Sequence, residues 1–239
     1  MIKDTNLASK QQVEEFYNAF KEHQKRLGVN IRHRTIFKNL KKNGLKSNSN
    51  VLEIGCGIGT VSSLILKYIS KGIFVGVDIS KESIEFAKKT YTHVKNAEFI
   101  VSDMMEFDYS IKFNFIVLPD VLEHIPLEQH QNLFKVISKV SSDDAVVVIN
   151  IPEPNCLDWA RTNHPDKLQI IDQSLSMQDL LNNAYPNNFK LYSMNSYSLQ
   201  YKEKDYTCVV FKKNMKRSSY TLKGKFILGI ENFLSKINL

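Results

Sequence analysis

The feature that most constrains this fold is an alternation of short apolar runs and helical segments between residues 51 and 151. The runs are rich in β-branched and aromatic residues and cover 51–54, 73–77, 98–101, 113–118 and 145–151. Because they are apolar throughout rather than alternating, they are typical of parallel strands with both faces covered. Helical patterns over 61–69, 81–90 and 127–140 separate several of them, at the ~30-residue period of βαβ units. The alternation predicts an α/β fold with a doubly wound, mostly parallel sheet.

The flanks of this region follow other patterns. Ser9 and Gln12 form a capping box that begins a helix ending at Gly28, and a second helical pattern ends at Gly44. We expect residues 1–45 to form a helical lid. After Pro152 the pattern predicts, in turn, a loop or insertion over 152–173, a short helix over 177–184, and an antiparallel hairpin over 189–197 and 206–211.

These patterns divide the chain into three parts. They are a lid over 1–45, a cofactor-binding domain over 46–213 and a basic amphipathic tail over 214–239. Within the domain, residues 152–205 are expected to shape the substrate pocket and to supply the closing strands. The prior of one or two domains for 239 residues agrees with this division.

Composition narrows the class of protein. Hydrophobic residues make up 43% and charged residues 24% of the chain, which excludes a disordered chain. Three scattered cysteines offer no metal spacing and favour a reduced compartment. The N-terminus has no apolar leader, so we expect a cytoplasmic protein. Because no Cys/His cluster has metal-ligand spacing, we expect no bound metal. A net charge of +7 favours anionic partners without selecting one.

A glycine-rich turn is the first chemical signal. Gly55, Gly57 and Gly59 follow a predicted strand and open a predicted helix, where they permit a tight turn and close approach of a ligand. Asp78 ends the next strand, 19 residues beyond Gly59, and Asp103 ends the third. These groups meet at the carboxyl edge of a doubly wound sheet, where such folds bind nucleotide-like cofactors. The turn alone suits NAD, FAD or S-adenosylmethionine (SAM).

Two details disfavour a dinucleotide. The spacing is Gly-x-Gly-x-Gly, one residue short of the pyrophosphate fingerprint. Glu53 stands just before the turn, where its carboxylate would repel a pyrophosphate but suits a cationic amino group.

At this point the chain resembles the class I SAM-dependent methyltransferases of the small-molecule type. The matching segments, in order, are VLEIGCGIGT, VGVDIS, FIVSDMMEFD, FNFIVLPDVLEHIP and VVVINIP. The resemblance implies a seven-stranded sheet in the order 3-2-1-4-5-7-6, with strand 7 antiparallel. It also implies SAM as cofactor and S-adenosylhomocysteine (SAH) as product.

The resemblance implies a role for each matching residue. Asp78 would bind the ribose hydroxyls and Ile79 would pack on adenine, while Asp103 and the Met104 backbone would read the ring edge. The methionine part would lie against the strand-one turn and the end of strand four. The residues concerned are Glu53, Gly55, Cys56, Gly57, Gly59, Leu118, Pro119 and Asp120. Tyr17 is either a core residue of the first helix or a lid residue that closes over the cofactor.

Candidates for catalysis and acceptor binding are fewer. His124 is either a general base, since its unperturbed pKa lies near working pH, or a lining residue. His164 is either a second catalytic candidate or a surface residue. Arg32 and His33, beside Arg34, either contact an anionic acceptor or belong to a solvated helix face. Trp159 either anchors its loop or forms a pocket wall, and Arg161 either binds an anionic substrate or is solvated.

The function expected from these residues is methyl transfer from SAM to an oxygen or nitrogen of a polar or anionic small molecule. A sugar and a lipid-linked acceptor are included. Alternatives are a nucleic-acid or protein methyltransferase, an NAD-dependent oxidoreductase, and a SAM-binding module without turnover. Nucleic acid is disfavoured because strand four ends in Leu-Pro-Asp rather than Asn-Pro-Pro-aromatic.

The tail has two interpretations. Six basic residues precede an apolar helical stripe formed by Phe226, Ile227, Ile230, Phe233, Leu234 and Ile237. The tail is either a helix on an anionic membrane surface or a helix packed on its own domain or on a second subunit in a homodimer.

Overall fold

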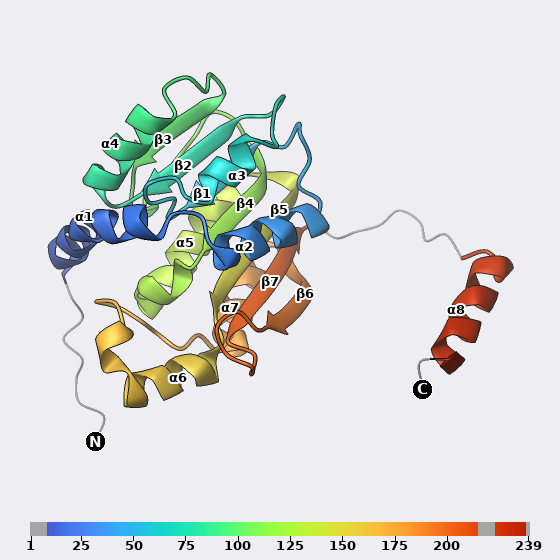
Figure 1. Cartoon of the computed structure of the whole chain (residues 1–239). Coiled ribbons are helices and arrows are strands. Elements are labelled where there is room, and N and C mark those ends of the chain that lie inside the picture. The colour runs from blue at the N-terminus through green and yellow to red at the C-terminus, as the bar shows by residue number, and fades with distance from the viewer. Residues whose placement is uncertain (1–8, 215–222, 238–239) are drawn as a thin grey trace.

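The computed structural model describes residues 9–214 and 223–237. Its centre is a seven-stranded sheet in the order β3-β2-β1-β4-β5-β7-β6 (Figure 1). The strands are β1 (Val51–Ile54), β2 (Phe74–Asp78), β3 (Ala97–Val101), β4 (Phe113–Pro119), β5 (Ser141–Pro152), β6 (Phe189–Tyr197) and β7 (Tyr206–Lys213). β7 runs antiparallel to both β5 and β6, and the other neighbouring strands are parallel. The predicted strand order and the antiparallel last strand are confirmed.

Helices cover both faces of the sheet, which explains the uninterrupted apolar strands. On one face, Leu52 and Val75 belong to the hydrophobic cluster that includes α5 (Leu127–Val140) and α7 (Met177–Ala184). On the other face, Val51 and Phe74 belong to the cluster of α2 (Ile31–Lys42), α3 (Ser62–Leu66) and α4 (Lys81–Thr90). Neighbouring residues of one strand therefore enter opposite halves of the core.

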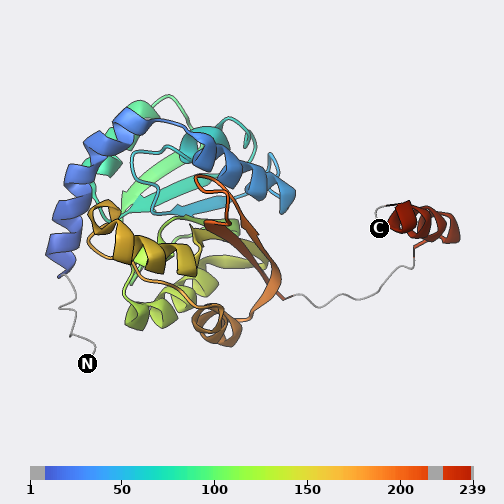
Figure 2. The ribbon, with the colours of Figure 1, turned by 60° about the horizontal axis from the view of Figure 1, so that its bottom comes forward.

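The helix α1 (Lys10–Leu27) begins at the predicted capping box, where the Ser9 hydroxyl accepts a hydrogen bond from the Gln12 amide at 3.3 Å. It lies along the edge of the sheet beside α4, as the turned view shows (Figure 2). Asn18 Oδ1 accepts a bond from the Ser80 hydroxyl at 2.7 Å, and Lys21 pairs with Glu82 at 2.8 Å. These contacts join α1 to the first turn of α4.

The structure corrects the sequence-based prediction in three places. Residues 152–173 are not a loop throughout, because α6 (Pro154–Asn163) and the 3-10 helix η2 (Pro165–Lys167) form there. Glu153 caps α6 by accepting a bond from the Cys156 amide at 3.0 Å, and Pro154 occupies the first turn, where its missing N–H costs nothing. β5 also begins four residues earlier than expected, and α3 is shorter than the 61–69 pattern.

The remaining short elements are the 3-10 helices η1 (Leu122–His124) and η3 (Tyr185–Asn187). The last helix, α8 (Lys225–Ile237), stands apart from the sheet and its covering helices in both views (Figures 1 and 2). Among the residues described, no helix has the length and apolar character needed to cross a membrane.

Candidate cofactor and acceptor cleft

A cleft of about 1310 Å³ lies at the carboxyl ends of the central strands, beneath α1. The turn after β1 and the ends of β2, β3 and β4 form its floor. Side chains of α1 and α2 form one wall, and the segments 166–171 and 199–200 close the far side. The topology brings these parts together because parallel strands end at one edge of the sheet.

The turn after β1 requires glycine for two reasons. Gly55 and Gly57 have φ of 70° and 53°, a region that residues with a Cβ rarely adopt. A Cβ on Gly55 would stand 2.2 Å from the Val121 side chain, and one on Gly57 would stand 2.7 Å from Gln24 Nε2 of α1. The turn therefore needs glycine at both positions for its backbone, and at Gly55 also because Val121 packs so closely, whereas the Gln24 side chain could move aside at Gly57.

Asp78 is held by the turn that it faces. Its Oδ2 accepts a hydrogen bond from the Gly57 amide at 2.7 Å, and its Oδ1 accepts one from the Ser80 amide at 2.8 Å. Burial raises the pKa of this carboxyl, and the two amide bonds oppose that shift. A carboxylate offers about four acceptor positions, so this fixed group still has lone pairs for two ligand hydroxyls.

Glu53 carries an unused acceptor inside the cleft wall. Its Oε2 accepts a bond from the Ser62 hydroxyl at 2.7 Å, while its Oε1 is buried with no partner among the described residues. Burial raises the Glu53 pKa to about 8. The Tyr17 hydroxyl of α1 is likewise buried without a partner. Buried polar atoms are rarely left unpaired, so these two mark places where a ligand's polar groups would bind.

Asp103 lies at the far end of the half of the cleft that contains Asp78 and Glu53, which we call the cofactor half. Its carboxylate pairs with the Lys10 ammonium and accepts a bond from the Met105 amide at 3.1 Å. Burial opposes ionisation of Asp103, but these contacts outweigh it and lower its pKa. Met104 has φ of 68° and is buried beneath this corner, while Ile79 lines the cleft beside it.

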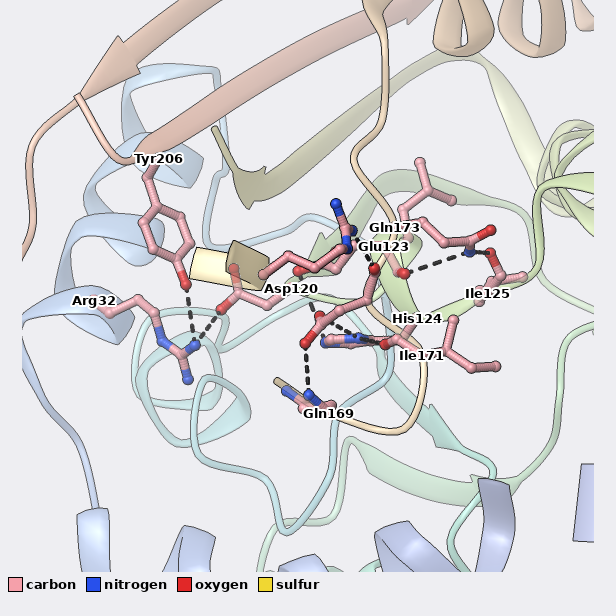
Figure 3. A network of polar contacts seen from close by, with 12 residues as sticks. Arg32, Asp120, Glu123, His124, Ile125, Gln169, Ile171, Gln173 and Tyr206 are labelled. Carbon is pink, nitrogen blue, oxygen red and sulfur yellow. Dashed lines mark hydrogen bonds and ion pairs between the residues drawn. The ribbon is translucent and has the colours of Figure 1, made fainter. Parts of the chain in front are cut away.

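The other half of the cleft begins at the end of β4. Asp120 has φ of 57°, and its Oδ2 forms an ion pair with Arg32 Nη1 at 3.0 Å (Figure 3). The same guanidinium nitrogen lies 3.3 Å from the Tyr206 hydroxyl oxygen, and Asp120 Oδ1 is buried without a partner among the described residues. Arg32 therefore lines the cleft as one member of an ion pair, with part of its charge neutralised.

His124 has a defined tautomer. Its Nδ1 lies 2.6 Å from the Ile171 carbonyl oxygen and 3.2 Å from Asp172 Oδ1, so Nδ1 carries a proton (Figure 3). Nε2 lies 3.8 Å from Glu123 Oε1 and is the ring nitrogen that can accept a proton when the ring is neutral. Burial alone would lower the His124 pKa, but Glu123, Asp172 and the Ile171 carbonyl raise it to about 9.

Several predicted site residues lie elsewhere. Trp159 is 44% exposed and packs edge-on against His164 and Tyr201. Arg161 donates to the Asp172 carbonyl at 2.8 Å, which braces the loop behind His124. These three predicted residues, Trp159, Arg161 and His164, do not line the cleft, and their assigned roles stay predictions.

The remaining predicted residues are close to the cleft or line it. His33 lines it and caps α2, where its Nδ1 accepts a bond from the Asn30 amide, and burial lowers its pKa to about 4. Cys56 and Pro119 also line it. Leu118 belongs to the core below, and Gly59 ends the turn beside Tyr91.

Sequence reasoning missed many other lining residues, among them the polar or charged Lys10, Gln24, Gln129, Lys167, Gln169 and Gln200 and the apolar Leu199. Lys10 and Gln24 reach the cleft because α1 docks on it, and no spacing rule shows that contact. The others lie in α5, in η2 and in loops, and only the tertiary fold brings these segments to the cleft.

Comparison with known proteins agrees with this geometry. Residues 45–214 match a family model described as a methyltransferase domain. Magnesium protoporphyrin IX methyltransferase from Synechocystis PCC 6803, solved with bound SAH, has a similar fold with a TM-score of 0.68 at 16% identity, covering 86% of this chain and all of that one.

Two curated relatives match a shorter region. Putative methyltransferase 235L of Invertebrate iridescent virus 6 is 30% identical over 111 residues, which are 44% of this chain and 41% of that protein. (S)-coclaurine N-methyltransferase of Papaver somniferum is 26% identical over 107 residues, or 44% of this chain and 30% of that protein. The chain spans less than half the length of these relatives.

The sheet order is that of the Rossmann-like fold of class I methyltransferases, and the similar Synechocystis structures were solved with bound SAH and with bound SAM. The chain belongs to the methyltransferase-domain family. This assignment replaces the alternative of an NAD-dependent oxidoreductase.

Proposed function

We propose that this chain transfers a methyl group from SAM to an oxygen or nitrogen of a polar small molecule bound in the second half of the cleft. The observation that carries the proposal is the continuity of the cleft, which runs from Asp78 and Glu53 past Asp120 to His124. Its volume of about 1310 Å³ is large enough for a cofactor and a small acceptor together.

The chain's own residues fit the cofactor. Asp78 would accept bonds from the ribose hydroxyls, and Asp103 would face the adenine amino group after release from Lys10. The unpaired Oε1 of Glu53 would accept a bond from the ammonium of the methionine part. SAM, when bound, supplies a methyl group on a positively charged sulfur.

His124 would act as the general base. With Nδ1 bonded to the Ile171 carbonyl, Nε2 is the nitrogen that would take a proton from an acceptor hydroxyl or ammonium. Asp172 would hold the ring in this orientation. The rest of the rate enhancement would come from alignment of the two reactants and exclusion of water.

The acceptor half combines charges of both signs with apolar walls. Its lining includes the basic residues Arg32 and Lys167, the acids Asp120 and Asp166, and the apolar residues Leu168, Ile171 and Leu199. Because Arg32 is already paired with Asp120, this surface favours a polar acceptor with both donors and acceptors, such as a sugar-containing or zwitterionic molecule. A nucleic acid is a weaker candidate, since the chain at the end of β4 reads Leu-Pro-Asp rather than Asn-Pro-Pro-aromatic.

The experiment that tests the proposal is transfer of labelled methyl from SAM to pooled polar metabolites, with SAH formation followed in parallel. We expect label in a small-molecule fraction and its loss in the His124→Gln variant. Label found only in added RNA or protein would replace the proposed acceptor class. SAM binding without SAH formation in any pool would indicate a module without turnover.

A further inference from the structure

The helix α8 carries an apolar face that the described part of the chain leaves uncovered. Ile227, Ile230, Phe233 and Leu234 are between 45% and 64% exposed, and their spacing of three and four places them on one side of the helix. α8 stands apart from the sheet domain in both views (Figures 1 and 2). An isolated helix of 13 residues is only marginally stable in water, so this one needs a surface to fold against.

The charge of the chain is concentrated around this helix. Residues 212–239 hold seven of the 32 Lys and Arg residues but one of the 25 acidic residues. The remaining 211 residues are close to neutral, so the tail carries nearly all of the net +7. Its single acid, Glu231, is paired with the Lys223 ammonium at 2.5 and 2.7 Å.

The charges are placed around the apolar face rather than on it. Lys225 and Lys236 are eleven positions apart, which is close to three full turns, and so share one side of α8. That side is turned away from Ile227 and Leu234, while Phe233, three positions before Lys236, lies at the border of the apolar face. A stripe of large apolar residues beside lysines is the pattern of helices that lie in the interface of an anionic membrane.

We propose that α8 binds the surface of a bilayer containing anionic phospholipid. The helix would lie in the plane of the interface with Ile230 and Phe233 in the acyl boundary and the lysines among the headgroups. At about 1.5 Å per residue it is about 20 Å long, too short to cross a hydrocarbon core of about 30 Å.

Two other occupants fit the same observations less well. A nucleic acid would attract the lysines but leaves the apolar stripe exposed. A second copy of α8 would cover the stripe but would bring two strongly positive tails together, which costs free energy. An anionic lipid surface satisfies both the charge and the apolar face.

The test is cosedimentation of the full chain with vesicles of phosphatidylcholine alone and of phosphatidylcholine with about 30% phosphatidylserine. We expect binding to the anionic vesicles only, weakening as salt is added. The double variant Ile230→Ser/Phe233→Ser should bind at least about tenfold more weakly, because each side chain loses its apolar burial. The matched control is Leu228→Ser, on the opposite side of α8, which should bind as the parent does.

Three results would overturn the proposal. They are no binding to anionic vesicles, binding that is equal in the parent and the double variant, and a dimeric mass in solution that the double variant reduces to a monomer. Binding to RNA that survives the double variant, without vesicle binding, would assign the tail to nucleic acid. All variants lie outside the cleft, so thermal unfolding and SAM binding of the domain serve as controls and stay unchanged.

Discussion

At the residue scale, the unpaired oxygen of Glu53 links cofactor binding to protons. Burial raises the Glu53 pKa to about 8, so the free protein holds this carboxyl mostly protonated at pH 7. A bound ammonium would favour the carboxylate and lower that pKa. SAM binding should therefore release a proton near pH 7, and affinity should rise with pH until about 8.

Calorimetry in two buffers of different ionisation enthalpy measures this proton. Glu53→Gln should bind SAM with less proton release and a flatter pH dependence, with any proton from SAM itself remaining in both. Equal proton release in the parent and the variant would show that Glu53 does not face the ammonium.

Asp78 should carry a large part of the cofactor affinity. Asp78→Ala removes an acceptor of two ligand hydroxyls and also frees the Gly57 and Ser80 amides that hold the turn. Charge-assisted hydrogen bonds are worth roughly 1.5–3 kcal/mol each, so the dissociation constant for SAM should rise at least about tenfold. Asp108→Ala, at an exposed carboxylate paired with Lys139, is the control. An unchanged constant in Asp78→Ala contradicts the assignment.

His124 should set the pH dependence of methyl transfer. Its pKa is raised to about 9, and only the neutral imidazole, with Nδ1 protonated and Nε2 free, can accept a proton. Consequently kcat/KM should increase with pH and level off above about 9, and this limb should be absent in His124→Gln. His164→Gln is the discriminating control, because His164 is outside the cleft lining. Loss of activity in that variant, with His124→Gln unaffected, would move the base to His164.

At the element scale, we expect α1 to determine how long the cofactor stays bound. Tyr17 and Gln24 of this helix face the cofactor half, and α1 is joined to α4 through Asn18 and Lys21. The double variant Asn18→Ala/Lys21→Ala removes both contacts, and hydrogen bonds contribute about 1 kcal/mol each. Dissociation of SAM should become up to about tenfold faster, as measured by stopped flow.

The control for α1 is Gln11→Ala, since the Gln11 side chain donates to Glu15 of the same helix at 2.9 Å. If both variants release SAM at the parent rate, α1 does not act as a lid. The division of the chain into lid, domain and tail stays a prediction until this measurement.

The elements that sequence patterns predict well are those with a local cause. The capping box of α1 and the strands β1, β2 and β4 follow from neighbouring residues and appear within a residue or two of the expected positions. α6 differs from the loop predicted over 152–173, although Glu153 and Pro154 are local signals of a helix start. The predicted start of β5 at residue 145 is four residues too late, because Asp143 and Asp144 interrupt the apolar run by which a strand is predicted.

At the scale of the whole molecule, ligand binding should raise the unfolding temperature. A ligand at 100 times its dissociation constant adds about 2.7 kcal/mol, and a domain of this size gains roughly 2–4 °C per kcal/mol. We expect SAM and SAH each to raise the midpoint by roughly 5–10 °C in differential scanning fluorimetry, and NAD to leave it unchanged. A shift with NAD alone would contradict the cofactor assignment.

By itself, the sequence determined the sheet, its order through the resemblance, the glycine turn, and the acids at the strand ends. Each of these depends on local periodicity or on a motif contained in a few residues. The tertiary structure alone decided which side chains meet across the cleft. Lys10 pairs with Asp103, Arg32 with Asp120, and Asp172 orients His124. Partners 48 to 93 residues apart leave no periodic trace in a single sequence, because their contact depends on how the helices dock on the finished sheet.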